Sequence, residues 1–234
     1  MKKTAVFILM VIMAANLAHS QVLIALLFGD KLSTDKFQLG IRLAGNLENF
    51  TGWEGTQSQF AFGFGIYGAL KLSPKFSLQP ELLFKDPRGA ERLPTKAFGN
   101  ADLDPLLANA AVAAKLAYVS LPILLKYHLT PQFSVGFGPQ LGYISSARYE
   151  YKAQVYAKDD LFFKEDIKST VNSLDFALAF NLEYTLQKQR PIQIGLRYYV
   201  GLVDVFKDSS GHSAKNSVFQ VYLGIPVGGQ PKEK

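Results

Sequence analysis

Aspartate, serine and histidine, the side chains of many hydrolytic active sites, occur close together at one place in the chain. Asp208, Ser209, Ser210 and His212 all fall within residues 208–212. A catalytic triad needs its nucleophile, base and acid to be held in one geometry, and closeness in a polar stretch does not provide that geometry. We therefore predict no catalytic residues and expect that the protein is not an enzyme.

Acidic residues occur in groups that could bind calcium or bridge lipopolysaccharide through divalent ions. Their spacing and number do not match an EF-hand loop, so we expect solvated loop charges rather than a metal site. The groups are Asp102 with Asp104, Asp159 with Asp160, and Glu165 with Asp166.

Other motifs associated with cofactors are equally weak. The Gly-x-Gly motifs at 63–65 and 136–138 do not open a helix after a strand, as a nucleotide-binding loop would. His128 stands alone, and the chain has no cysteine, which excludes disulfides, thiolate zinc sites and cysteine nucleophiles. No metal and no cofactor is expected.

A different set of charged residues stands out by its regular spacing. Each lies within or at the end of an alternating apolar–polar stretch, on the side opposite the apolar residues. If that side lines the inside of a barrel, these charges are removed from water and must pair with one another. We predict that they form a lumen-facing polar network. The residues are Arg42, Lys71, Glu81, Lys85, Lys126, Asp175, Glu183 and Arg197.

The stretch 133–143, FSVGFGPQLGY, shows the alternation that positions these charges. Phe133, Val135, Phe137, Leu141 and Tyr143 fall on one side of an extended strand, with small or polar residues on the other. The pattern occurs eight times, enough strands to close a barrel. The predicted strands are 36–44, 60–72, 76–85, 116–129, 133–143, 173–185, 192–203 and 217–227.

The connections between these strands alternate in length. Those after the second, fourth and sixth strands are short, whereas the others are long: 45–59, 86–115, 144–172 and 204–216. Short turns on one rim and long loops on the other are typical of outer-membrane barrels, and an even strand count puts both ends of the barrel on the short-turn rim. Pro80 lacks a ladder donor in the middle of the third strand, which predicts a bulge there.

The same alternation occurs in soluble barrels such as lipocalins, with the apolar side inward. Soluble barrels cover their outer side with charged residues, but here the side opposite the apolar residues is mainly Gly, Ala, Ser and Gln. Small residues suit the crowded interior of a narrow barrel. We therefore predict an all-β fold: an eight-stranded antiparallel up-and-down transmembrane β-barrel with short periplasmic turns and long extracellular loops, at residues 36–227.

The ends of the chain indicate export. Residues 1–20 combine Lys2 and Lys3, an apolar run, and the small-x-small sequence Ala18-His19-Ser20, which predicts a signal peptide cleaved before Gln21. Residues 21–35 are expected to form a periplasmic N-terminal segment, and 228–234 a C-terminal tail. The formal net charge of +6 comes from scattered residues, so no nucleic-acid partner is expected.

Several segments carry a resemblance to a known family. LQPELLFKD (78–86), YVSLPILLKY (118–127), FSVGFGPQLGY and IQIGLRYYVGLVDV (192–205) resemble the small outer-membrane β-barrel proteins of Bacteroidetes, the PorT-like or "porin family" barrels. The resemblance implies the barrel fold, localisation in the bacterial outer membrane and, by analogy with PorT, an accessory role in an envelope secretion complex. It also implies Glu before the Leu-Pro of the fourth strand, where this chain has Ser120.

These observations together predict an outer-membrane barrel with a plugged polar lumen and a structural or surface-binding role. Alternatives are a narrow passive porin, an accessory subunit of a secretion complex, and, less favoured, a barrel enzyme or a soluble lipocalin-like carrier. The expected partners are outer-membrane lipid and an envelope protein bound through the long loops. The sequence leaves open the ligand, solute passage, oligomeric state, and the conformations of residues 22–31 and 100–115.

Overall fold

The computed structural model describes residues 36–156, 159–186, 191–207 and 213–227. The predicted signal peptide, the segment 21–35, the tail 228–234 and the Asp208–His212 group lie outside the described residues. The elements are β1 (Phe37–Thr51), β2 (Gln59–Lys71), β3 (Phe76–Leu93), α2 (Asp104–Leu107), β4 (Ala111–His128), β5 (Phe133–Tyr156), β6 (Asp159–Asp166), β7 (Leu174–Thr185), β8 (Gln193–Asp204) and β9 (Lys215–Val227).

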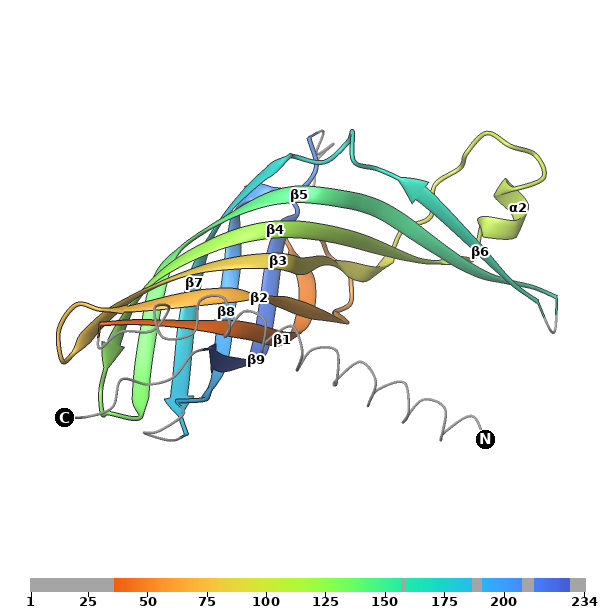
Figure 1. Cartoon of the computed structure of the whole chain (residues 1–234). Coiled ribbons are helices and arrows are strands. Elements are labelled where there is room, and N and C mark those ends of the chain that lie inside the picture. The colour runs from red at the N-terminus through yellow and green to blue at the C-terminus, as the bar shows by residue number, and fades with distance from the viewer. Residues whose placement is uncertain (1–35, 157–158, 187–190, 208–212, 228–234) are drawn as a thin grey trace, which may run out of the picture.

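Eight of these strands form a closed antiparallel ring (Figure 1). Around the ring, β1 pairs with β2, β2 with β3, β3 with β4, β4 with β5, β5 with β7, β7 with β8, β8 with β9, and β9 with β1. Ile41 of β1, for example, lies opposite Ile66 on one side and Ile225 on the other. The predicted eight-stranded up-and-down barrel is therefore confirmed, and each strand of the ring pairs with a neighbour on both sides.

The apolar side of each strand points out of the ring. In β7 the burial alternates residue by residue: Ala179 is fully buried inside, whereas its neighbour Phe180 is 51% exposed outside. Large apolar side chains are exposed in the same way on every strand of the ring. Such a surface is unfavourable against water and favourable against hydrocarbon. None of the helices in the described part of the chain is long and apolar enough to cross a bilayer.

One rim of the barrel carries the tight turns. Ser73 Oγ accepts hydrogen bonds from the backbone amides of Lys75 and Phe76 in the β2–β3 turn. Thr130 Oγ1 caps the β4–β5 turn in the same way by accepting from the amide of Phe133. The start of β1 and the end of β9 meet at this rim, where Leu39 lies opposite Val227. The short-turn rim and the position of both barrel ends follow the prediction.

At the opposite rim the strands continue far beyond their predicted ends. β3 runs to Leu93, β4 begins at Ala111 and β5 runs to Tyr156, so much of the predicted loops 86–115 and 144–172 is strand. β6, which the sequence did not predict, pairs with β5 alone and lies outside the ring. The segment 100–115, whose conformation the sequence left open, contains the short helix α2, which ends at Leu107, and the beginning of β4 at Ala111.

Bulges explain why these extensions were missed. The β2–β3 register shifts between Phe64 and Gly65, which pair with Lys85 and Leu83, so Phe84 is the extra residue. The bulge predicted at Pro80 is absent, because Pro80 pairs in register with Ile123. A second shift, in the β4–β5 pairing, makes Ser145 an extra residue. Each bulge exchanges the inward and outward positions that follow it, and the simple alternation ends there.

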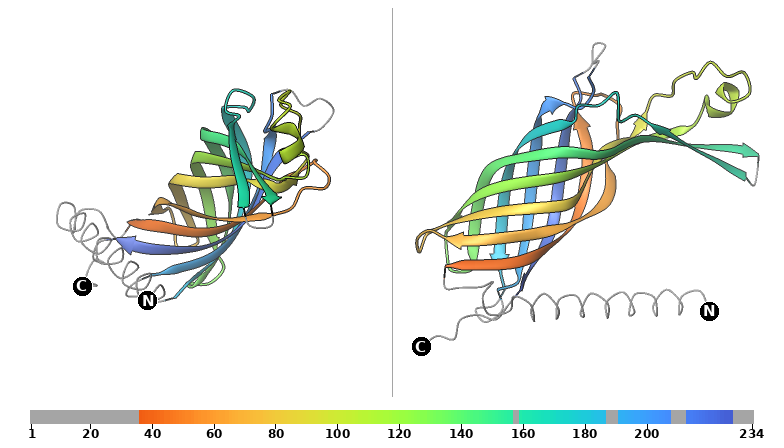
Figure 2. Two further views of the ribbon diagram at one scale, coloured as in Figure 1. Left: turned by 90° about the vertical axis from the view of Figure 1, so that its right-hand side faces the viewer. Right: turned by 45° about the horizontal axis from the view of Figure 1, so that its top comes forward.

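The outer part of β5 and β6 leaves the barrel sideways. We call this hairpin, from Ala147 of β5 to Asp166 of β6, the arm; Figure 2 shows it projecting away from the barrel wall. The loop 94–110, which contains α2, packs on one side of the arm, where Phe98 contacts Tyr151 and Phe163 with ring centroids 5.3 and 5.4 Å apart. The arm is thus a small sheet with one side covered by protein.

The outward apolar surface gives a direct test of the membrane orientation. Replacing Phe180 by Arg places a charge near the middle of the wall, which lowers the free energy of unfolding by about 2–4 kcal/mol if that wall faces hydrocarbon. The same change at Leu186, beyond the end of β7, is expected to have an effect of about 0–1 kcal/mol. Urea titrations in lipid vesicles measure both, and equal effects would contradict the orientation.

Candidate functional site

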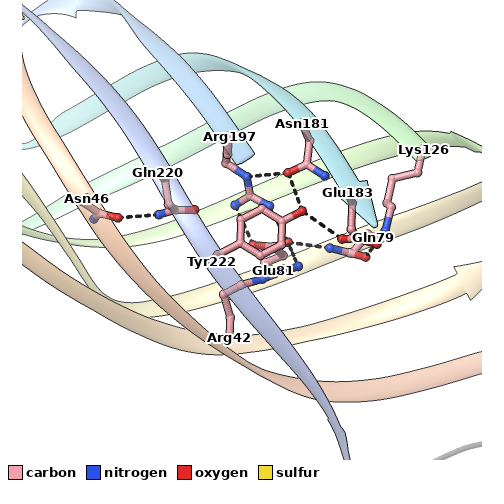
Figure 3. A network of polar contacts seen from close by, with 10 residues as sticks. All are labelled: Arg42, Asn46, Gln79, Glu81, Lys126, Asn181, Glu183, Arg197, Gln220 and Tyr222. Atoms are coloured by element: carbon pink, nitrogen blue, oxygen red, sulfur yellow. Dashed lines mark hydrogen bonds and ion pairs between the residues drawn. The ribbon is translucent and has the colours of Figure 1, made fainter. Parts of the chain in front are cut away.

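The lumen is filled by charged side chains from many strands, and Figure 3 shows the part nearest the short-turn rim. Its centre is Glu81 of β3, which is 2% exposed. Arg197 of β8 binds both carboxylate oxygens of Glu81, with N–O distances of 2.8 and 2.7 Å. Arg42 of β1 donates to Oε1 at 2.7 Å. Two arginines, from strands β1 and β8 that are separated only by β9, thus share one carboxylate, and Arg197 reaches it from the opposite side of the ring.

An ion pair between a lysine and a glutamate extends this group toward the short-turn rim. Lys126 of β4 forms a buried ion pair with Glu183 of β7 and donates to Gln79 Oε1 at 3.0 Å. Gln79 in turn donates to Glu81 Oε1 at 2.7 Å, which connects the Lys126–Glu183 ion pair to the two arginines. We call Arg42, Gln79, Glu81, Lys126, Glu183 and Arg197 the inner cluster. It has three cations and two carboxylates, a formal charge of +1.

Tyrosine rings complete the inner cluster. The ring of Tyr222 lies between the guanidinium groups of Arg42 and Arg197, at 3.9 and 5.2 Å, and its hydroxyl donates to Glu183 at 2.9 Å. The neighbouring strand β8 has no side chain at Gly195, which leaves space for this ring. A Cβ at Gly195 would lie 2.1 Å from the ring of Tyr222. The small residues of the lumen side therefore make room for arginine–tyrosine contacts from neighbouring strands.

A second charged group lies farther along the lumen, toward the long-strand rim. Arg88 of β3, fully buried, forms ion pairs with Asp86 and Asp175. Tyr199 donates to Asp86 Oδ1 at 3.0 Å, and the Arg88 guanidinium lies 4.1 Å from the centre of the Tyr118 ring. We call Asp86, Arg88 and Asp175 the outer cluster. With one cation and two carboxylates its formal charge is −1, which balances the inner cluster.

Ser120 has a defined place in the outer cluster. Its hydroxyl donates to Asp86 Oδ2 at 2.6 Å and accepts from Arg88 Nη2 at 3.0 Å. The resemblance noted above implied a glutamate at this position. Here the neighbouring strand provides the carboxylate through Asp86, and serine is the short side chain that leaves space for it.

The structure divides the predicted network residues into those inside and those outside. Six are buried in the lumen: Arg42, Glu81, Lys126, Asp175, Glu183 and Arg197. Asp175 pairs with Arg88, not with the inner cluster. Lys71 is exposed at the short-turn rim and Lys85 is exposed on the outside of the wall, so neither joins a cluster, contrary to expectation. Lys85 lies opposite the outward-pointing Phe64, because the bulge at Phe84 turned it out.

Because of the same bulge, the sequence pattern did not predict two residues that point into the lumen. Asp86 and Arg88 follow it and point inward, but the third strand was predicted to end at Lys85. Glu48 was likewise assigned to a loop, yet it is buried and accepts a hydrogen bond from Gln59 at 3.0 Å. Before the bulge, the lumen-facing residues of this strand are odd-numbered, such as Gln79 and Glu81. The even-numbered Asp86, Arg88 and Ala90 continue the same alternation shifted by one residue, and this shifted pattern could have identified the outer cluster.

The two ends of the lumen differ in chemistry. The short-turn end opens into a cavity of about 700 Å³, lined by Lys71, His128 and others, that ends at Lys126 and Glu183. His128 is not isolated there, because its ring nitrogen hydrogen-bonds Ser77 at 2.9 Å. The other end is closed by apolar residues that we call the mouth cluster. It comprises Phe50, Leu93, Leu107, Val112, Leu116, Ile144, Ile167, Val171 and Val205, with Trp53 and Phe206 packed against it.

The acidic side chains that the structure describes at Asp102, Asp104, Glu165 and Asp166 serve other contacts or are exposed, and of Asp159 and Asp160 it describes only the backbone. Asp104 accepts hydrogen bonds from the amides of Phe98 and Gly99, which orders the loop before α2. Glu165 pairs with Lys96 and accepts from the hydroxyl of Tyr151. Among the described residues, no three His, Cys, Asp or Glu side chains are placed to hold a metal ion together.

The shared carboxylate of the inner cluster predicts a large effect of its removal. Replacing Glu81 by Gln leaves two buried arginines without their partner, which is expected to lower the free energy of unfolding by about 3–5 kcal/mol. The double variant Glu81→Gln/Arg42→Met should lose less than the sum of the single changes, because it removes one of the unpaired charges. Urea titration in vesicles measures this.

The exposed Glu54 provides the control for that measurement. Glu54→Gln removes an equal charge from the surface and should change stability by less than about 0.5 kcal/mol. Equal stability of the Glu81→Gln and Glu54→Gln variants would show that the inner cluster does not hold the lumen together.

Comparison with known proteins gives a family and several similar structures. The family model described as outer membrane protein beta-barrel domain matches residues 28–207. No curated protein matches the chain. Similar solved structures include the attachment invasion locus protein Ail of Yersinia pestis, with 9% identity over 82% of this chain and 97% of Ail, at a TM-score of 0.43.

Two further small barrels are similar at the same level. Neisserial surface protein A is 9% identical over 81% of this chain and 96% of its own, with a TM-score of 0.40. OprG of Pseudomonas aeruginosa is 13% identical over 81% of this chain and 91% of its own, with a TM-score of 0.33. Identities this low say nothing about a shared function. The family match, in contrast, covers most of the chain, and the protein therefore belongs to the outer membrane protein beta-barrel domain family.

Proposed function

We propose that this outer-membrane barrel is a non-conducting protein with a structural and surface-binding role. The observation that carries the proposal is the filled lumen: the inner and outer clusters lie one beyond the other along its length, and the mouth cluster closes the outer end. An eight-stranded barrel has an interior that side chains just fill. A solute would have to separate ion pairs that no water compensates.

The surface part of the proposal is supported by the strands beyond the outer rim. β3, β4, β5 and β6 build a sheet there whose inner side is packed, with aromatic contacts among Phe98, Tyr151 and Phe163. Burial, together with Glu165, raises the pKa of Tyr149 on that side to about 12. Strands and a packed core display a fixed surface, which suits the binding of an envelope protein better than separate flexible loops would.

A narrow passive pore is the second candidate, and the cavity at the short-turn rim favours it. In a barrel of this family that rim faces the periplasm. The cavity, however, ends at the buried pair of Lys126 and Glu183, with the inner cluster directly behind it. A pore would therefore require this pair to open.

The remaining predictions from the sequence are part of the same proposal. We assign the charged lumen residues a structural role and propose no catalysis and no nucleic-acid partner. Membership in the Bacteroidetes PorT-like group, and with it an accessory role in an envelope secretion complex, rests on the sequence resemblance. Co-purification from gently solubilised outer membrane tests that role.

Conductance measurements test the filled lumen. The purified protein in a planar bilayer should show no steady channels of nanosiemens size, because the two clusters block the lumen. The variant Trp53→Ala/Phe206→Ala loosens the mouth cluster alone and should also remain closed, since the charged clusters are intact. Steady nanosiemens channels in the unaltered protein would contradict the proposal and favour the pore.

Export of the chain gives a separate prediction. If residues 1–20 are a signal peptide, the protein isolated from outer-membrane fractions begins at Gln21. Intact-mass measurement determines this end, and heat-dependent migration on a gel identifies the folded barrel in the same sample. A protein that retains residues 1–20 would show that the segment is not cleaved.

A further inference from the structure

The arm has two sides with different surroundings. Its inner side is covered by the loop that contains α2, through the contacts of Phe98 with Tyr151 and Phe163. Its outer side carries side chains that are largely exposed, among them Lys152 and Lys164.

The outer side of the arm continues the lipid-facing wall of the barrel. Along β5 the outward residues Leu141 and Tyr143 are followed, across the bulge at Ser145, by Arg148 and Lys152. The same side of the sheet is therefore apolar where it faces hydrocarbon and charged beyond it. Tyr143, 55% exposed, lies near the change, as aromatic residues at membrane interfaces do.

The direction of the arm decides where this side points. Figures 1 and 2 show the hairpin bending away from the barrel, with α2 on its inner side. When the rim of a barrel bends outward, the side that faced sideways into lipid turns toward the plane of the membrane. The outer side of the arm is thus directed at the surface of the outer leaflet.

The side chains on this face match that surface in chemistry. Phe162 is 46% exposed and lies between two ammonium groups, those of Lys164 at 4.9 Å and Lys152 at 5.9 Å from its ring centre. Arg148 is engaged with Glu150 through a hydrogen bond of 2.8 Å. An exposed aromatic ring with flanking lysines can insert at the headgroup level while the ammonium groups bind phosphates.

We propose that the outer side of the arm docks onto the phosphate-bearing headgroups of the outer leaflet of the same membrane, with Phe162 at the interface and Lys152 and Lys164 on phosphates. Two arguments carry this assignment: the side is continuous with the lipid-facing wall, and the exposed Lys152 and Lys164 beside Phe162 complement headgroup phosphates, whereas Arg148 is held by Glu150 and lies opposite Asp166. The proposal requires the barrel in the membrane and does not depend on the surface-binding role, so either can fail without the other.

The absence of cysteine makes the orientation measurable with single labels. Ala113→Cys places a label on the outer side, since Ala113 pairs with Glu150, and Ala101→Cys places one in the loop on the inner side. In vesicles that contain a lipid with a headgroup quencher, a fluorophore at 113 should be quenched several-fold more than one at 101. Equal quenching at the two positions would overturn the proposal.

The chemistry of the contact is tested with the same label at position 113. Quenching should be stronger in vesicles that contain anionic phosphate-rich lipid than in zwitterionic ones, and 0.5 M salt should reduce the difference. Lys152→Gln/Lys164→Gln should weaken the preference for anionic lipid by about fivefold per lysine. The control Lys71→Gln/Lys75→Gln, at the short-turn rim, should leave it unchanged.

Each outcome bears on the docking alone. A preference that persists in Lys152→Gln/Lys164→Gln, or that falls equally in the control, would overturn the role of these lysines. Heat-dependent migration of every variant on a gel verifies that the barrel is folded. A folded barrel whose label at 113 is unquenched in all vesicles would show that the outer side faces water or a protein partner.

Discussion

The requirement that backbone polar groups be hydrogen-bonded where no water is present determines this structure. A strand in hydrocarbon cannot leave an N–H or C=O unpaired without a cost of several kcal/mol, so the sheet must close on itself. The pairing of β9 with β1 achieves that closure, and the number of strands in the closed ring sets the width of the lumen. Closure at eight strands leaves a lumen too narrow for bulk water but wide enough for side chains, and the chain fills it with charge.

Charge in such a space is tolerated only as a connected set. Glu81 accepts from Arg42, Gln79 and Arg197 at once, and Asp86 accepts from Arg88, Ser120, Gln140 and Tyr199. Together with the side chains that hydrogen-bond to them, the inner cluster links β1, β3, β4, β7, β8 and β9, and the outer cluster links β3, β4, β5, β7, β8 and β9. The lumen charges thereby connect parts of the ring that are distant along the wall, in addition to the backbone ladder. The small formal charges of the two clusters offset one another.

The alternation of residues in the sequence was sufficient to predict the barrel wall but not its outer extension. Period-two patterns such as 133–143 identify each spanning strand, because lipid on one side and a packed lumen on the other impose opposite residue types. Phe84 and Ser145 interrupt the pattern, and a bulge has no distinctive residue type that would reveal it. The phase change at Phe84 led to Lys85 being assigned to the lumen and Arg88 to a loop. The direction of the arm depends on strand bending, which no local pattern encodes.

The contact between the Tyr222 ring and the bare backbone at Gly195 has a consequence for how this lumen can vary among related chains. The two positions share one volume: with the tyrosine present, a Cβ at 195 has no space, and Gly40 stands in the same relation to Tyr67. A relative with a larger residue at either glycine must therefore have a smaller one opposite. We expect these pairs to change together in evolution, as complementary halves of one steric unit, even where the overall barrel stays the same.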